Sequence, residues 1–220
     1  MKMRNRKLIF RVFILAVILD LIGIITGNQL LRFVFKPMII LLLMTYYSLI
    51  IEPENKMYLA ALFLCFIGDV LLLFDSQLNF ILGLASFLIA HLLFIKIVAG
   101  RLIKSSVSQK IKAIIPFAFI FTALIFLLKD TLGDLLIPVI VYALAITSFG
   151  VISLLNYITK RNISSLFLVG GATFFILSDV TLAINKFYEH QEYFPVFIMV
   201  TYVFSQYMIC KYMIVHENKE

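Results

Sequence analysis

Apolar residues follow one another along the chain in blocks of about 20, and short polar breaks separate the blocks. A helix that crosses the hydrocarbon core of a bilayer needs about 20 predominantly apolar residues. Eight segments meet that length, and the pattern predicts a transmembrane helix in each: 8–26, 33–51, 57–74, 80–99, 111–128, 132–157, 166–184 and 194–215. The breaks are too short to form a soluble domain. We therefore expect one integral membrane domain over residues 1–220, an all-α polytopic transmembrane helical bundle.

The composition points the same way. Hydrophobic residues make up 63% of the chain and charged residues 14%, whereas a soluble domain has roughly 45–50% and 25%. A soluble protein of this size would need more polar residues to cover its surface. The two cysteines, Cys65 and Cys210, lie inside apolar runs and form no CxxC motif. We expect a multi-pass integral membrane protein, in the plasma (inner) membrane if its source is bacterial.

The net charge of +7 is distributed unevenly. If the N-terminus is cytoplasmic, all but four of the 19 Lys and Arg residues fall on the cytoplasmic side. The four exceptions are Arg32, Lys36, Lys129 and Lys186. Basic residues accumulate on the cytoplasmic side of membrane proteins, so this bias predicts that both termini are cytoplasmic. The charge is thus explained by orientation, and we expect no nucleic-acid partner.

Three aspartates lie well inside the predicted spans, away from their ends: Asp20, Asp69 and Asp179. A charge at the middle of a bilayer costs about 2.5–3.5 kcal/mol on insertion scales, so such residues are candidates for function. Asp69 and Asp179 share a local pattern, because each follows a small residue and continues as Asp-Val-x-Leu. Asp20 lacks this pattern, and we expect it to make a structural contact between helices.

In the predicted topology, the spans that carry Asp69 and Asp179 cross the membrane in the same direction. Both aspartates then fall at similar depth, toward the outer half. Two carboxyl groups at one level can act together, one protonated and the other ionised. The small residues before them, Gly68 and Ser178, would let another helix or a ligand approach closely.

A few other polar residues occur within the spans. Phe80, Gly83, Phe87 and His91 have the spacing of one helix face, on which His91 either makes a structural hydrogen bond or holds an acid or a water. Further candidates for lining the interior are Tyr142, Tyr202 and Gln206.

Lys36 and Pro37 are expected to open the second span at the outer boundary. Proline suits the first turn of a helix, and a lysine there can extend to the head groups. A second interpretation is that Lys36 binds a lipid phosphate, and both stay open.

Several of these residues form an ordered set of short motifs. The motifs are Lys36-Pro37, Gly68-Asp69, Phe80-x2-Gly83-x3-Phe87-x3-His91, Gly171-Ala172-x2-Phe175-x2-Ser178-Asp179, Asn185-x-Phe187 and Tyr202-x3-Gln206. The set resembles that of the YhhN-like family of eight-pass membrane proteins, whose characterised animal members are lysoplasmalogenases. The resemblance extends from the second predicted span to the eighth, and Asp20 has no counterpart in it.

The resemblance implies an enzyme that hydrolyses the vinyl ether bond of a lysoplasmalogen to a fatty aldehyde and a glycerophospho-base. Its substrates would be a lysophospholipid and water, with no metal and no organic cofactor. Asp69 and Asp179 would be the catalytic acid and base, in an order that the sequence leaves open. The expected supporting residues are Lys36, His91, Tyr142, Ser178, Asn185, Tyr202 and Gln206.

Three other functions compete with this one. An intramembrane aspartyl protease would carry Gly-x-Gly-Asp and Tyr-Asp, but Phe66 and Ser178 stand at the positions of the missing glycine and tyrosine. A zinc hydrolase would need several converging histidines, and only His91 lies within a span. The third is a proton-coupled carrier, for which the two Asp-Val-x-Leu motifs suggest a four-plus-four repeat.

Overall fold

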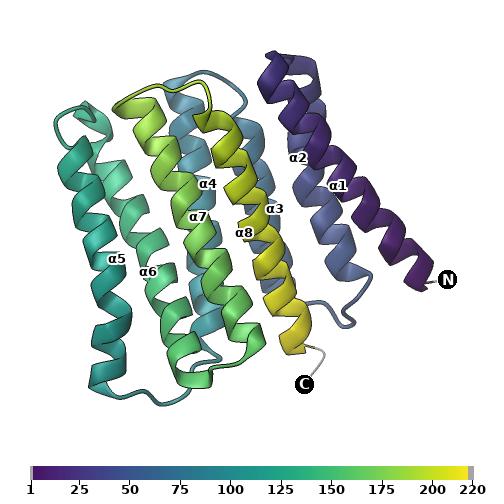
Figure 1. The fold of residues 1–220 in the computed structure, drawn as a ribbon, viewed down its shortest axis with the longest axis vertical. Coiled ribbons are helices and arrows are strands. Elements are labelled where there is room, and N and C mark those ends of the chain that lie inside the picture. The colour runs from purple at the N-terminus through teal and green to yellow at the C-terminus, as the bar shows by residue number, and fades with distance from the viewer. Residues whose placement is uncertain (1, 218–220) are drawn as a thin grey trace. The chain divides into compact units, whose positions relative to one another are not determined.

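The computed structural model describes residues 2–217, which form eight α-helices and no strand (Figure 1). The helices are α1 (Lys2–Thr26), α2 (Gln29–Ser48), α3 (Lys56–Leu71), α4 (Gln77–Ala99), α5 (Val107–Leu128), α6 (Leu136–Lys160), α7 (Ile163–Phe187) and α8 (Phe194–Glu217), with a single 3-10 turn, η1 (Gly133–Leu135), before α6. Each predicted span coincides with one helix, so the prediction of an all-α polytopic bundle is confirmed. Lys219, which counted toward the predicted orientation, lies outside the described residues.

Seven of the eight helices are long and apolar enough to cross a membrane, and α3 is the exception. Its 16 residues rise about 24 Å, less than the roughly 30 Å of a hydrocarbon core. The predicted span 57–74 was too long because residues 72–76 form the connection to α4. The side chain of Ser76 accepts a hydrogen bond from the Asn79 N–H at 3.1 Å and so caps the start of α4. As a result, α3 ends two residues after Asp69.

Polar side chains at the helix starts explain where several helices begin. Asn28 and Asn55 each accept a hydrogen bond from a backbone N–H of the first turn of α2 and α3. Ser106 and Asn162 form capping boxes at the starts of α5 and α7.

The cap at Asn28 corrects one prediction. Because α2 begins at Gln29, Pro37 lies inside the helix and not in its first turn, as the sequence had suggested. The same shift, from residue 33 to residue 29, places Lys36 about one turn deeper along α2 than expected.

The helices divide into two compact units, residues 2–93 with 213–217, and Phe94–Tyr212. In the first unit, α2 packs against both α1 and α3. In the second, α6 packs between α5 and α7, as Figure 1 shows. The unit boundaries fall inside α4 and α8, so each of these helices contributes to both units. A single membrane domain and the cytoplasmic location of both termini stay predictions.

Candidate functional site

In the first unit, Asp69 of α3 lies beside a buried lysine. Asp69 is 2% exposed, and its Oδ1 lies 3.9 Å from Nζ of Lys36 on α2. Lys36 is itself 9% exposed, so its ammonium is buried beside Asp69 and is not extended toward the head groups. The binding of a lipid phosphate by Lys36 stays a prediction. Both interpretations placed Lys36 at the start of its helix, and the earlier start of α2 accounts for the difference. The result is a buried ion pair between α2 and α3.

The residue before Asp69 sets a close approach between α3 and α4. A Cβ added to Gly68 would lie 2.5 Å from Cε2 of Phe87, closer than real Cβ atoms come to other heavy atoms. A Cβ at Gly83 would lie 3.4 Å from the Gly68 carbonyl oxygen. The ring of Phe87 therefore fills the space that the missing side chain of Gly68 leaves, as expected for a small residue at a helix contact.

His91 extends the same face of α4. Its Nδ1–H donates to the Phe87 carbonyl at 2.8 Å, and the side chain is completely buried. Phe80, Gly83 and Phe87 are also buried, which confirms that these four residues share one face. Of the two roles considered for His91, the structural hydrogen bond is present, and a role in holding an acid or a water stays a prediction.

In the second unit, Asp179 of α7 has a neutral partner. Its Oδ2 accepts a hydrogen bond from the hydroxyl of Tyr142 on α6. Tyr142 is buried, whereas Asp179 is partly exposed. The neighbouring Ser178 is buried and donates to the Ile198 carbonyl of α8 at 3.0 Å, which links α7 to α8. Tyr142, Ser178 and Asp179 thus form one local site on α6, α7 and α8.

Tyr202 and Gln206 pack in the second unit as well. The ring of Tyr202 meets Phe175 edge to face, with ring centres 5.5 Å apart. The Nε2 of Gln206 donates to the Tyr202 hydroxyl at 3.3 Å, and both side chains are buried. Asn185 has a different setting, because its Oδ1 accepts the Gln191 N–H at 3.1 Å and so holds the connection between α7 and α8.

The predicted site residues therefore divide between the two units. Lys36 and His91 lie in the unit of Asp69, while Tyr142, Ser178, Tyr202 and Gln206 lie in the unit of Asp179. The pairing of Asp69 with Asp179 across the two units stays a prediction.

Comparison with known proteins places this arrangement in a family. The YhhN family model matches residues 31–213, most of the chain. The chain belongs to the YhhN family. The match covers both Asp-Val-x-Leu motifs and confirms the resemblance, and it begins after α1. No solved structure matches this member of the family significantly.

Arg32 was not among the candidate site residues expected from the sequence. Arg32 lies four residues before Lys36 on the same face of α2 and acts electrostatically on Asp20, as Lys36 does. The i, i+4 spacing of the two cations was the signal that could have identified it. Among residues 2–217 no three His, Cys, Asp or Glu side chains gather as metal ligands would.

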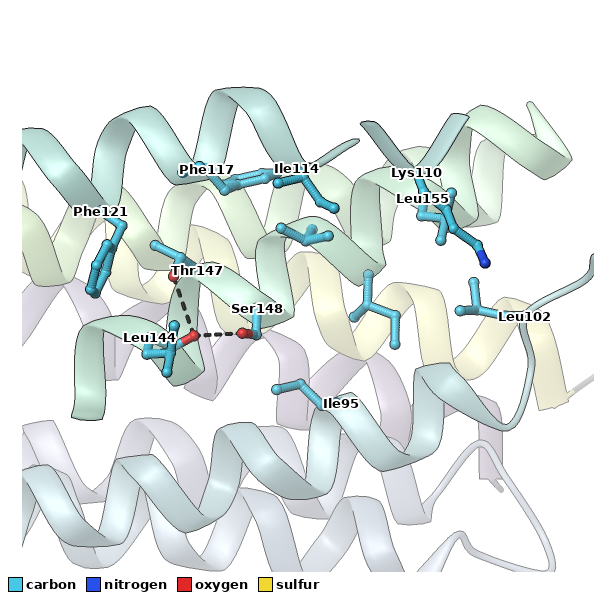
Figure 2. A pocket seen from close by; sticks show the side chains of 13 residues that line it. Ile95, Leu102, Lys110, Ile114, Phe117, Phe121, Leu144, Thr147, Ser148 and Leu155 are labelled. Carbon is cyan, nitrogen blue, oxygen red and sulfur yellow. Dashed lines mark hydrogen bonds between the residues drawn. The ribbon is translucent and has the colours of Figure 1, made fainter. Parts of the chain in front are cut away.

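A separate groove of about 550 Å³ lies in the second unit, between the end of α4, α5 and α6 (Figure 2). Thr147 and Ser148 line it, but their hydroxyls donate to the Ala143 and Leu144 carbonyls of their own helix. The wall is therefore apolar, with Lys110 at one end. At 100° per residue, the lining residues of α6 face away from Tyr142, so this groove is not the Asp179 site.

Proposed function

We propose that the chain hydrolyses the vinyl ether bond of a lysoplasmalogen-type lysophospholipid, releasing a fatty aldehyde and a glycerophospho-base. One observation carries the proposal: each unit holds one aspartate of an Asp-Val-x-Leu motif, and these two aspartates have partners of different kinds. Asp69 lies beside the ammonium of Lys36, and Asp179 accepts from the hydroxyl of Tyr142. Hydrolysis of a vinyl ether needs two such groups, a carboxylic acid and a carboxylate.

The reaction proceeds in three steps. The acid transfers its proton to the outer alkene carbon, and the carbon bonded to oxygen becomes an oxocarbenium-like cation. Water then adds to this cation while the carboxylate takes a proton from the attacking water. As the hemiacetal breaks its bond to the glycerol oxygen, the protonated base gives that oxygen its proton. The deprotonated acid takes the hydroxyl proton of the hemiacetal as the aldehyde forms, so both groups return to their starting states. A nearby carboxylate also stabilises the positive charge of the transition state.

The surroundings favour one assignment of the two roles. A buried carboxylate next to an ammonium pairs with it as a charged group, which suits Asp69 as the base and as the group that stabilises the cation. Asp179 has a neutral hydroxyl as its partner and is partly exposed, which suits a group that is protonated again in each cycle. Ser178 and His91 would then be positioning residues, since they bind backbone carbonyls of α8 and α4.

The test is aldehyde release by the protein purified in detergent. Wild type is incubated with a lysoplasmalogen and, separately, with its saturated alkyl-ether analogue. We expect aldehyde from the vinyl ether alone, and a loss of at least about 100-fold in folded Asp69→Asn and Asp179→Asn. Asp75→Asn, at an exposed loop position, is the matched control and should keep full activity. No aldehyde from well-folded wild type, or full activity in either Asp69→Asn or Asp179→Asn, would contradict the proposal.

A second candidate is a proton-coupled carrier. The division into two compact units, each with one Asp-Val-x-Leu motif, fits the internal repeats from which many carriers are built. Such a carrier would move a solute across liposomes in response to a proton gradient and would release no product. Aldehyde formation from the vinyl ether lipid would decide for the enzyme.

A further inference from the structure

Helix α1 buries one narrow face, and a carboxylate lies at its centre. Phe13, Ala16, Asp20 and Gly23 are the buried residues of this face, while large side chains on the other faces, such as Ile18 and Ile22, are exposed. Asp20 is 0% exposed, and both of its carboxylate oxygens are buried without a hydrogen-bond partner among the described residues. Buried polar groups are nearly always hydrogen-bonded, so these two acceptors indicate a missing donor.

Two cations of α2 face this carboxylate. Gly23, one turn from Asp20, packs under the stem of Arg32, because a Cβ added there would lie 3.0 Å from Cγ of Arg32. Arg32 and Lys36 are four residues apart on α2, and both act electrostatically on Asp20. The Nε of Arg32 is also buried without a hydrogen-bond partner among residues 2–217. The contact of α1 with α2 thus contains two unpaired acceptor atoms and one unpaired donor.

A ligand that satisfies these atoms must carry donors at one end and anionic acceptors at the other. A primary ammonium offers N–H donors to the oxygens of Asp20. A phosphate offers acceptors to the guanidinium of Arg32 and the ammonium of Lys36. A quaternary ammonium such as choline has no N–H and would leave Asp20 without a hydrogen bond.

We propose that a phosphoethanolamine head group binds between α1 and α2, with its ammonium on Asp20 and its phosphate on Arg32 and Lys36. This inference rests on the proposed function and assigns the head group of its substrate. Arg32 is partly exposed, whereas Asp20 is completely buried, so the phosphate would lie at the end of the site nearer to the surface and the ammonium at the deeper end. Lys36 also lies 3.9 Å from Asp69, which places the bound phosphate next to one of the two proposed catalytic carboxylates.

The test measures binding without chemistry. Saturated 1-O-alkyl lysophospholipids, which lack the vinyl bond, are added to the purified wild type, and the shift of the unfolding temperature is followed against lipid concentration. The head group is varied from ethanolamine through its mono- and dimethylated forms to choline, with the alkyl chain constant. We expect choline to bind about tenfold more weakly than ethanolamine, with the largest drop when the last N–H is lost. Equal affinities across the series would overturn the proposal.

Two variants test whether Asp20 causes the preference for ethanolamine over choline. Asp20→Asn should abolish the difference between ethanolamine and choline, while Asp75→Asn at an exposed position should keep it. A preference that survives in folded Asp20→Asn would overturn the assignment, and if this variant does not fold, the methylation series on wild type decides.

The same lipids separate this proposal from the proposed function. Asp179→Asn should lose aldehyde release and retain the head-group preference. A head-group preference in wild type that releases no aldehyde would support the site and contradict the hydrolase. Aldehyde release without any head-group preference would support the hydrolase and contradict the head-group site.

Discussion

Gly68-Asp69 and Ser178-Asp179 have nearly the same local sequence and different surroundings. Asp69 is almost completely buried and lies 3.9 Å from a lysine ammonium, whereas Asp179 is partly exposed and accepts from a tyrosine hydroxyl. The small residues before them also differ in use. Gly68 makes room for the ring of Phe87, and Ser178 donates a hydrogen bond to α8.

The difference shows that the motif Asp-Val-x-Leu places a carboxylate within a helix but does not determine which side chain that carboxylate contacts. Asp69 lies two residues before the end of the short helix α3, where Lys36 of α2 reaches it. Asp179 lies about two turns before the end of the longer helix α7, beside Tyr142 of α6. Two carboxylates with a charged and a neutral partner are suited to two different tasks, which is the basis of the proposed acid and base.

The largest expected effect comes from removing the cation beside Asp69. Lys36→Met leaves a buried carboxylate without its ammonium, and breaking a buried pair costs about 3 kcal/mol or more of unfolding free energy. Thermal unfolding in detergent measures the loss. Lys129→Met, which removes an exposed lysine, should change stability by less than about 0.5 kcal/mol.

The double variant Lys36→Met with Asp69→Asn tests the cause. Because it removes the charge that the single variant leaves unpaired, it should recover most of the stability. If the two losses simply added, the ion pair would not be the reason for the effect.

Glycine substitutions compare the packing of the two units. Gly68→Ala would place a Cβ 2.5 Å from the ring of Phe87, and Gly150→Ala would place one 2.5 Å from the ring of Phe117. Overpacking of this kind costs about 1–3 kcal/mol of unfolding free energy in each case. Only Gly68→Ala should also lower aldehyde release, since Gly68 adjoins Asp69. Adding Phe87→Leu should relieve the Gly68→Ala defect, and a double variant that is no more stable would contradict the contact.

The hydrogen bond of Asp179 is expected to have a smaller effect on stability. Tyr142→Phe removes the hydroxyl and keeps the ring, so unfolding free energy should fall by about 1 kcal/mol. Aldehyde release should fall about tenfold, because the hydroxyl orients the proposed acid. Tyr157→Phe on the same helix is the control. Unchanged activity in Tyr142→Phe would argue that Asp179 acts without this partner.

The smallest effect is expected at Asn185. Although it belongs to the ordered motifs, its side chain holds the α7–α8 connection through the Gln191 N–H. Asn185→Ala should lower unfolding free energy by about 1 kcal/mol and change aldehyde release by less than about twofold. A loss of activity at unchanged stability would instead assign Asn185 to the reaction.

The sequence predicted the helices well because a bilayer restricts what a chain can do. Backbone groups in hydrocarbon must be paired within the segment, so each apolar block of sufficient length becomes a helix. The starts of several helices could also be read from Asn28, Asn55, Ser106 and Asn162, whose side chains cap them. Where the hydropathy pattern was used without the caps, the starts were displaced, and Lys36 was placed at the boundary.

The positions of the membrane aspartates were determined by the sequence alone, because a carboxylate inside an apolar run is visible without a structure. Their partners were decided by the tertiary structure. Tyr142 and Asp179 are 37 residues apart and lie on different helices, as Lys36 and Asp69 do. In a soluble protein the polar face of a helix would show how it is turned, but a helix in lipid is apolar toward both the lipid and its neighbours. The rotation of α1 that buries Asp20, and that of α2 that directs Arg32 and Lys36 toward it, therefore appear only when the helices are packed together.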